Sequence, residues 1–286
     1  MRQFLVENKQ VKNGLIKLEG KDFRYLRQVL RVRPGDMISV RLADGTLNNA
    51  TVAKVDEAAR VITLQLCAGA PAETEAQKTI TRGVQAAQAA AASPVEYWLF
   101  QFIPKPQKFE MIVRQATECG VSVIVPVIGE YSEKSSLLAL QGAKKERLER
   151  IIKEARQQSG SPVDTKVLEP VTLDKAIELW CQSEDGGFDP FDRLRDRNHR
   201  VAFVLSERDD CSGMLRTSVQ SAGGLEKIKK AAIAVGSEGG ISPEEVKALE
   251  EKGLFVPVHF AVNILRCETA ALYGIAAVQT MILGGE

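Results

Sequence analysis

The chain is poor in histidine and in aromatic residues. Only 2 of its 286 residues are histidine, and Phe, Trp and Tyr together make up 6%. It contains no Ser-His-Asp arrangement and no spacing typical of metal ligands, which argues against a triad hydrolase and against a metal centre. We therefore expect a function that needs no metal ion.

Paired cysteines and long apolar runs are also missing. The five cysteines are scattered without a Cys-x-x-C pair, so thiols kept reduced in a cytosol explain them most simply. The first residues, Met-Arg-Gln-Phe-Leu-Val-Glu, lack the apolar core of a signal peptide. The most apolar later segment, 260–284, is interrupted by Arg266 and Glu268, and charges are costly inside a membrane. We expect a cytoplasmic protein without an anchor.

The formal net charge of +1 hides an asymmetry along the chain. Residues 1–70 hold 12 Lys or Arg against 7 Asp or Glu, so the first quarter is basic and the remainder is acidic. A basic unit favours a polyanionic partner. A merely solvated basic face explains the composition equally well.

Residues 1–70 predict a small β-rich unit with one helix. Alternating apolar residues predict strands over 37–42, 50–55 and 61–66. The helix is expected over 22–31, with Leu26, Val29 and Leu30 on its apolar face. Arg24, Arg27 and Arg31 fall at i, i+3 and i+7 on another face, which makes them a candidate phosphate track.

Residues 71–286 follow an α/β pattern after a linker at 69–79 and an Ala/Gln-rich tract at 84–93. Strands are predicted over 97–103, 121–128, 201–205, 231–235 and 254–258. Helices are predicted over 107–119, 144–158, 212–222, 243–252 and 267–282, with a polar surface loop at 182–199. This alternation predicts a mostly parallel sheet with helices on both faces.

A glycine-rich loop follows the strand predicted at 231–235. Ser242 and Glu245 predict a capping box for the next helix, so Gly236-Ser-Glu-Gly-Gly forms a tight connection before it. Such a loop can bring a ligand against backbone amides, although a plain tight turn explains it equally well. The spacing is not that of a dinucleotide-binding loop, and a P-loop lysine is missing. Glu238 could bind a ribose hydroxyl or a cationic group.

A second polar junction, Asn263-Ile-Leu-Arg-Cys-Glu-Thr-Ala, opens the last helix. Glu268 falls in the first helical turn, where the helix dipole favours an acid. Arg266 just before the helix is placed to meet a phosphate or a nucleobase carbonyl. A local Arg266–Glu268 ion pair that caps the helix is the alternative. Both junctions lie where a strand yields to a helix, the edge at which open α/β sheets bind ligands.

Three lesser candidates follow other strands. Lys105 and Lys108 lie between a strand and a helix and could reach a phosphate, but lysines in solvent are equally expected there. His259 ends a strand without an evident partner, and a structural role fits it better than a catalytic one.

Five ordered motifs resemble those of the SPOUT-class 16S rRNA (uracil-N3)-methyltransferases. The two junctions resemble the GPEGG-(I/L)-S and ILR-x-ETA motifs of that family. The other three stretches are Arg27-Gln-Val-Leu-Arg-Val-Arg-Pro-Gly-Asp, Lys108-Phe-Glu-Met-Ile-Val-Arg-Gln-Ala-Thr-Glu-Cys-Gly-Val and Gln158-Ser-Gly. The resemblance therefore spans nearly the whole chain.

The resemblance implies a PUA-like RNA-binding β-barrel over 1–70 and an α/β domain over 71–286 that ends in a deep trefoil knot. It implies a homodimer through the knot domain, S-adenosylmethionine as the cofactor and 16S rRNA of the small ribosomal subunit as the partner. The activity that it implies is methylation of N3 of a specific uridine.

The same resemblance assigns roles to residues. Cofactor-binding residues are expected at Leu205, Ser206, Gly236, Glu238, Gly239, Gly240, Ile264 and Leu265. Arg266 and Glu268 are expected to be catalytic: Arg266 would hold a uracil carbonyl or a flanking phosphate, and Glu268 would orient Arg266 or help to receive the N3 proton. RNA phosphates are expected at Arg24, Arg27, Arg31, Arg33, Lys105 and Lys108.

Five positions depart from the family pattern. Ser237 replaces a proline, Asn263 and Tyr131 stand where arginine is common, Gln157 stands where glutamate is common, and Ser161 replaces the arginine after the Gln-Ser-Gly run. These losses of charge or rigidity motivate an alternative: an RNA-binding assembly factor with the same fold that has lost turnover. A dinucleotide-dependent oxidoreductase rests on the glycine loop alone, and the glycine spacing disfavours it.

Overall fold

The chain forms two compact units. The computed structural model describes residues 3–7, 10–67, 95–133, 136–137, 143–182, 200–206, 228–260 and 262–283. The first unit holds the described part of residues 1–89 together with Arg156–Pro162, and the second unit holds the rest. The linker, the Ala/Gln-rich tract, the helix predicted at 212–222 and all but the first residue of the 182–199 loop lie outside the described residues.

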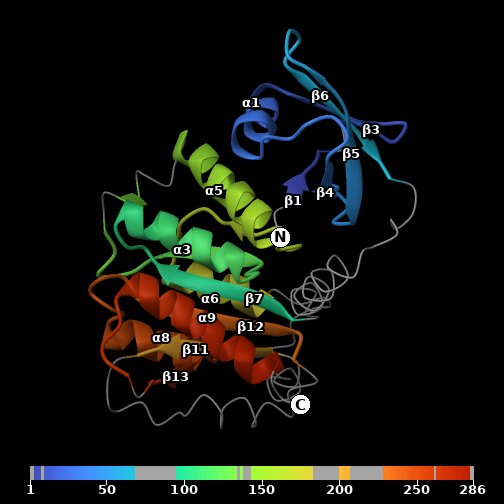
Figure 1. Ribbon diagram of the computed structural model, residues 1–286. Helices are drawn as coiled ribbons and strands as arrows, with labels where there is room; N and C mark the ends of the chain where they lie inside the picture. The colour runs from blue at the N-terminus through green and yellow to red at the C-terminus, as the bar shows by residue number, and fades with distance from the viewer. Residues whose placement is uncertain are drawn as a thin grey trace. The chain divides into compact units, whose positions relative to one another are not determined.

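The first unit is built on a six-stranded sheet (Figure 1). Its strands are β1 (Gln3–Leu5), β2 (Val11–Lys12), β3 (Leu15–Glu19), β4 (Met37–Arg41), β5 (Leu47–Asp56) and β6 (Val61–Leu66). They are ordered β1-β4-β5-β6-β3-β2, and every pairing is antiparallel except that of β1 with β4. Alternate residues such as Ile16, Leu18, Ile62 and Leu64 are fully buried in one core. The three predicted strands are confirmed.

The helical segment of the first unit differs from the prediction in its second half. An α-helix, α1 (Gly20–Arg24), continues into a wider π-helical turn, η2 (Tyr25–Val29), and ends there. Arg31 has a left-handed φ of 55°, so a helix that extends to residue 31 is wrong. The wider turn breaks the 3.6-residue spacing that the prediction assumed. Val29, expected on the apolar face with Leu26, is 55% exposed, whereas Leu26 is buried.

A parallel seven-stranded sheet forms the centre of the second unit. The strands are β7 (Glu96–Phe102), β8 (Val123–Ile128), β9 (Lys166–Val167), β10 (Val171–Thr172), β11 (Arg200–Leu205), β12 (Lys230–Val235) and β13 (Val256–Val258). The order is β10-β8-β7-β12-β11-β13, and β9 pairs with β8. The central strands β7, β8, β11 and β12 are almost continuously buried, as expected for a parallel sheet covered on both faces.

Helices cover both faces of this sheet, which confirms the predicted α/β architecture (Figure 1). Core residues of α3 (Pro106–Glu118), α5 (Ala143–Ser159) and α9 (Cys267–Leu283) belong to one apolar cluster. Those of α6 (Leu173–Gln182) and α8 (Pro243–Gly253) belong to a second cluster with the opposite faces of the strands. Within the described residues, no helix is long and apolar enough to span a membrane.

The start of α8 fixes the end of the glycine loop. The Ser242 hydroxyl accepts a hydrogen bond from the Glu245 amide, and the Glu245 carboxylate accepts one from the Ser242 amide at 2.9 Å. Pro243 occupies the first helical position. The predicted capping box is therefore confirmed, and the loop is anchored at β12 on one side and at a rigid helix start on the other.

Candidate functional site

A cavity of about 370 Å³ opens at the carboxyl ends of β11 and β12. Its lining includes every residue that was expected to bind a cofactor: Leu205, Ser206, Gly236, Glu238, Gly239, Gly240, Ile264 and Leu265. Arg266 and Lys108 also line it. The eight expected residues come from the three segments at the carboxyl ends of β11, β12 and β13. The segments meet because β11 pairs with both β12 and β13, so that the loops after these parallel strands leave at one edge of the sheet.

The glycine loop, residues 236–240, is folded back on itself. The Gly240 amide donates to the Ser237 carbonyl at 3.1 Å, and Gly240 has a left-handed φ of 79°. A Cβ on Gly236 would lie 2.6 Å from the carbonyl carbon of Gly240, too close for any side chain. The buried Gln101 side chain on β7 donates to the carbonyls of Val235 and Gly236, which fixes the start of the loop.

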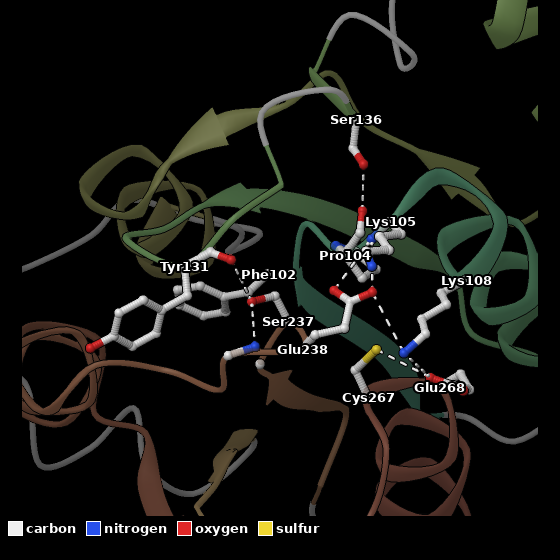
Figure 2. Close-up of polar contacts among 12 residues, drawn as sticks. Phe102, Pro104, Lys105, Lys108, Tyr131, Ser136, Ser237, Glu238, Cys267 and Glu268 are labelled. Carbon is white, nitrogen blue, oxygen red and sulfur yellow. Dashed lines mark hydrogen bonds and ion pairs between the residues drawn. The ribbon is translucent and has the colours of Figure 1, made fainter.

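Ser237 ties the glycine loop to the segment after β8. Its hydroxyl donates to the Tyr131 carbonyl at 2.8 Å and accepts from the Gly239 amide at 3.4 Å (Figure 2). Gly239 packs so closely there that an added Cβ would lie 2.8 Å from the Cβ of Tyr131. Hydrogen bonds thus supply part of the rigidity that a proline at position 237 would give.

Glu238 and Glu268 converge on one lysine. Figure 2 shows both carboxylates linked to the Lys108 side chain. The Lys108 ammonium lies 3.5 Å from Glu238 Oε1 and 3.3 Å from Glu268 Oε2. Glu238 also accepts from the Lys105 amide at 3.2 and 3.3 Å, next to the start of α3. Lys108, expected to grip phosphate, therefore already has two carboxylate partners.

Cys267 lies against Glu268 at the start of α9. Its thiol donates to Glu268 Oε2 at 3.3 Å. Burial, helped by this hydrogen bond, raises the pKa of the Cys267 thiol to about 12. Burial alone would raise the pKa of Glu268, but its backbone amide, the Cys267 thiol and Lys108 outweigh burial and hold that pKa below its ordinary value. Glu268 is therefore an anion at neutral pH and a weak base.

Lys108 responds to the same neighbours. Burial by itself would lower the pKa of the Lys108 ammonium, but the nearby Cys267 sulfur, Glu268 and Glu238 together raise it. The lysine therefore stays charged, and its two ion pairs persist across the neutral range.

Arg266 is exposed at the cavity and directly precedes α9. No hydrogen bond or ion pair joins its guanidinium to another residue in the part of the chain that the structure describes. Glu268 instead pairs with Lys108, so the alternative of a capping Arg266–Glu268 ion pair is wrong. The guanidinium of Arg266 is available to a ligand.

The cavity lining also includes residues that were given no site role from the sequence, among them His259, Phe260 and Cys267. His259 Nδ1 lies 3.3 Å from the Ser206 carbonyl, and Phe260 packs edge-on against Tyr273. His259 and Phe260 directly follow β13, so the strand-end rule that selected Leu205 and Gly236 applies to them as well. Cys267 lies within the second polar junction, between Arg266 and Glu268, but its residue type gave no reason to assign it a role.

The basic residues of the first unit are not equivalent. Arg24, Arg31 and Arg33 are exposed, and their guanidinium groups pair with none of the other described residues. Arg27 instead donates to Glu57 at 2.8 Å and to the Val32 carbonyl at 2.7 Å. The wider turn of η2 interrupts the helix face on which Arg24, Arg27 and Arg31 were expected to lie together, and Arg27 is bonded to residues of the first unit.

The positions that depart from the family pattern divide into two groups. Gln157 and Ser161 are buried within the first unit and are not part of the cavity lining. Asn263 lines the cavity, and Ser237 and Tyr131 shape the glycine loop. Among the described residues, no group of three or more His, Cys, Asp or Glu side chains could hold a metal ion.

Comparisons with known proteins agree with this geometry. A family model described as an RNA methyltransferase domain matches residues 91–279. The ribosomal RNA small subunit methyltransferase E of Aquifex aeolicus is 32% identical over 63% of this chain and 66% of its own length. The ribosomal RNA small subunit methyltransferase E 2 of Borreliella burgdorferi is 24% identical over 99% of this chain and 98% of its own.

Solved structures share the fold over nearly the whole chain. The ribosomal RNA small subunit methyltransferase E of Neisseria gonorrhoeae, bound to S-adenosyl methionine, matches with a TM-score of 0.69, 23% identity and 98% coverage of both chains. The putative methyltransferase Lpg2936 of Legionella pneumophila, in complex with the cofactor SAM, matches with a TM-score of 0.68, 20% identity and coverages of 97% and 96%. The expected architecture, an N-terminal β unit followed by a parallel α/β domain, is confirmed, and the likeness of the first unit to a PUA domain and the SPOUT-type knot of the second stay predictions.

Proposed function

Because this chain belongs to the RNA methyltransferase domain family, we propose that it is a cytoplasmic, S-adenosylmethionine-dependent enzyme that methylates N3 of a specific uridine in 16S rRNA. One observation carries the proposal. The glycine loop and the segment before α9, which bear the two most specific sequence motifs, line the same cavity with Arg266.

The cavity suits such a cofactor in size and chemistry. Its volume of about 370 Å³ lies in the range of small-molecule sites, roughly 300–1,000 Å³. Apolar residues such as Leu205, Phe260 and Leu265 can cover an adenine ring, and the Glu238 carboxylate matches the ammonium group of the methionine part. When bound, the cofactor supplies a methyl group on a positively charged sulfur.

The residues of the chain would act on the uridine. N3 must lose its proton to solvent water, and negative charge then spreads over the two flanking carbonyl oxygens. Arg266, exposed and unpaired among the described residues, is placed to hold one of these oxygens and stabilise that charge. Glu268 is a weak base because its pKa is lowered, so we assign it a role in holding charge at the cavity rather than in taking the N3 proton.

We further propose that Arg24, Arg31 and Arg33 bind RNA phosphates. Their exposure supports this role, and the pairing of Arg27 with Glu57 gives Arg27 a structural role instead. Lys105, whose side chain is exposed beside the start of α3, is a further phosphate contact. Phosphate contacts position the protein and carry no sequence information.

We also propose a homodimer formed through the second unit. Ile264 is 79% exposed although it belongs to a cavity segment, and Val262 and Tyr273 nearby in sequence are also exposed. Large apolar side chains gathered at the surface are typical of interaction sites. Sedimentation equilibrium of the wild type and of Ile264→Asp tests this: we expect a dimer that the charge weakens, and a monomeric wild type would contradict the proposal.

Transfer from labelled cofactor tests the activity directly. The purified chain is incubated with S-adenosylmethionine carrying a labelled methyl group and with either 16S rRNA or the small ribosomal subunit. We expect label in 3-methyluridine after digestion to nucleosides. Binding of RNA without transfer in either substrate would favour the assembly-factor alternative, and binding of NAD in calorimetry would favour the oxidoreductase.

A further inference from the structure

Lys108 occupies an unusual place for a lysine. It is the third residue of α3, and the N-terminal turn of a helix disfavours a cation because the helix dipole is positive there. Its side chain is only 27% exposed, so solvent does not fully compensate the charge. The compensation comes from Glu238 and Glu268, which approach it from the glycine loop and from the start of α9.

The two carboxylates depend on the lysine in turn. Glu238 and Glu268 are 29% and 14% exposed, and both lie within 3.5 Å of the same ammonium group. Without that cation, two partly buried like charges would face each other and push their segments apart. Three elements far apart in sequence, α3, the glycine loop and α9, are therefore joined at one ammonium group (Figure 2).

We propose that Lys108 is a positioning residue that holds the glycine loop and the first turn of α9 in the shape that binds the cofactor. The lysine acts through Glu238 and Glu268 and does not grip an RNA phosphate. This inference rests on the proposed function in taking the cavity as the cofactor site, but the fixing of the two segments is a property of the ligand-free chain.

Amide hydrogen exchange of the ligand-free protein tests the fixing of the loop. Lys108→Met should speed exchange several-fold in peptides that cover 236–242 and 266–271, because the free energy of local opening falls there. Arg114→Met is the matched control: Arg114 is an exposed cation on the same helix, paired with none of the other described residues. Equal exchange in the wild type and in both variants would overturn the proposal.

Calorimetry without RNA separates positioning from a simple charge effect. Lys108→Met removes a positive charge and Glu238→Gln removes a negative charge, so a pure charge effect would shift cofactor affinity in opposite directions. Loss of positioning should lower the cofactor affinity of both variants, by about tenfold each, as expected for a broken hydrogen bond between charged groups. The loss of affinity should be the same for S-adenosylmethionine and for the product S-adenosylhomocysteine, whose sulfur is uncharged. Opposite shifts in the two variants would contradict the proposal.

RNA binding and a conservative variant complete the test. Lys108→Arg keeps the charge and the donors, so we expect it to restore the slow exchange of both segments, and a failure to do so would contradict the ion-pair role. A Lys108→Met variant that lost RNA affinity and salt dependence but kept wild-type exchange would show a phosphate contact instead. If the wild type bound no S-adenosylmethionine, the proposed function would fail, and the exchange experiment would still decide the role of Lys108.

Discussion

Replacing Ser237 by alanine should loosen the glycine loop without disturbing the rest of the fold. The Ser237 side chain is buried and makes two hydrogen bonds, the stronger of them to the Tyr131 carbonyl at 2.8 Å. The second, from the Gly239 amide, is long at 3.4 Å and contributes little. Alanine fits the same space, so the loss is one of hydrogen bonding rather than of packing.

The expected cost follows from the unpaired Tyr131 carbonyl. A hydrogen bond between neutral groups contributes about 0.5–1.5 kcal/mol, and a buried acceptor left unpaired costs about 1–3 kcal/mol. Because this carbonyl is only partly buried, we expect a loss of about 1 kcal/mol in the free energy of unfolding. The loop should be less ordered before binding, and cofactor affinity should fall up to about fivefold, since ordering cost lowers affinity.

Denaturant unfolding and calorimetry measure the two effects. Ser122→Ala is the control: Ser122 lies in the same unit, and its hydroxyl makes no hydrogen bond to another described residue. We expect that variant to match the wild type. If Ser237→Ala had the same stability and the same cofactor affinity as the wild type, the idea that hydrogen bonds replace the proline of the family motif would be refuted.

Three further predictions concern the proposed catalytic and RNA-binding residues. Arg266→Ala should lower the single-turnover methylation rate about 10²–10³-fold, as loss of an oxyanion donor does, with unchanged cofactor affinity; a normal rate would remove it from the chemistry. The pKa of Glu268 is depressed in the fold, so its contribution to stability is present above the ordinary carboxyl pKa and is lost as pH falls through the folded value. Glu268→Gln should therefore be less stable than the wild type at neutral pH and approach it in acid, as unfolding at a series of pH values would measure. Removing Arg24, Arg31 and Arg33 together should lower RNA affinity and reduce the salt slope by about 2 to 3 units; an unchanged slope would exclude phosphate contacts.

Local patterns in the sequence predicted much of the fold. The capping box at Ser242 and Glu245 depends on residues three positions apart, and the structure confirms it. Likewise, the alternation of apolar strands with helices predicted the second unit, because a parallel sheet needs a crossover after each strand. The strands β1, β2, β9 and β10 were not predicted because each is only two or three residues long, and β3 and the helix α6 were missed as well.

Contacts between distant residues set the limit of the prediction. Lys108 pairs with Glu238 and Glu268, which are 130 and 160 positions away in sequence. No local sequence pattern predicts such a pairing. The same holds for Arg27, whose partner Glu57 is 30 positions away in sequence, and for the π-helical turn that left Val29 exposed. The eight residues expected to bind the cofactor were found in the cavity lining because the strand-end rule and the family motifs need no knowledge of tertiary contacts.

The central claim is methylation of uridine N3 in 16S rRNA, and nucleoside mass spectrometry of that RNA tests it most directly. RNA is taken from cells that lack this gene and from the same cells complemented with the wild type or with Arg266→Ala. We predict that 3-methyluridine is lost in the deletion, returns with the wild type and does not return with the variant. An unchanged 3-methyluridine content in the deletion would contradict the account.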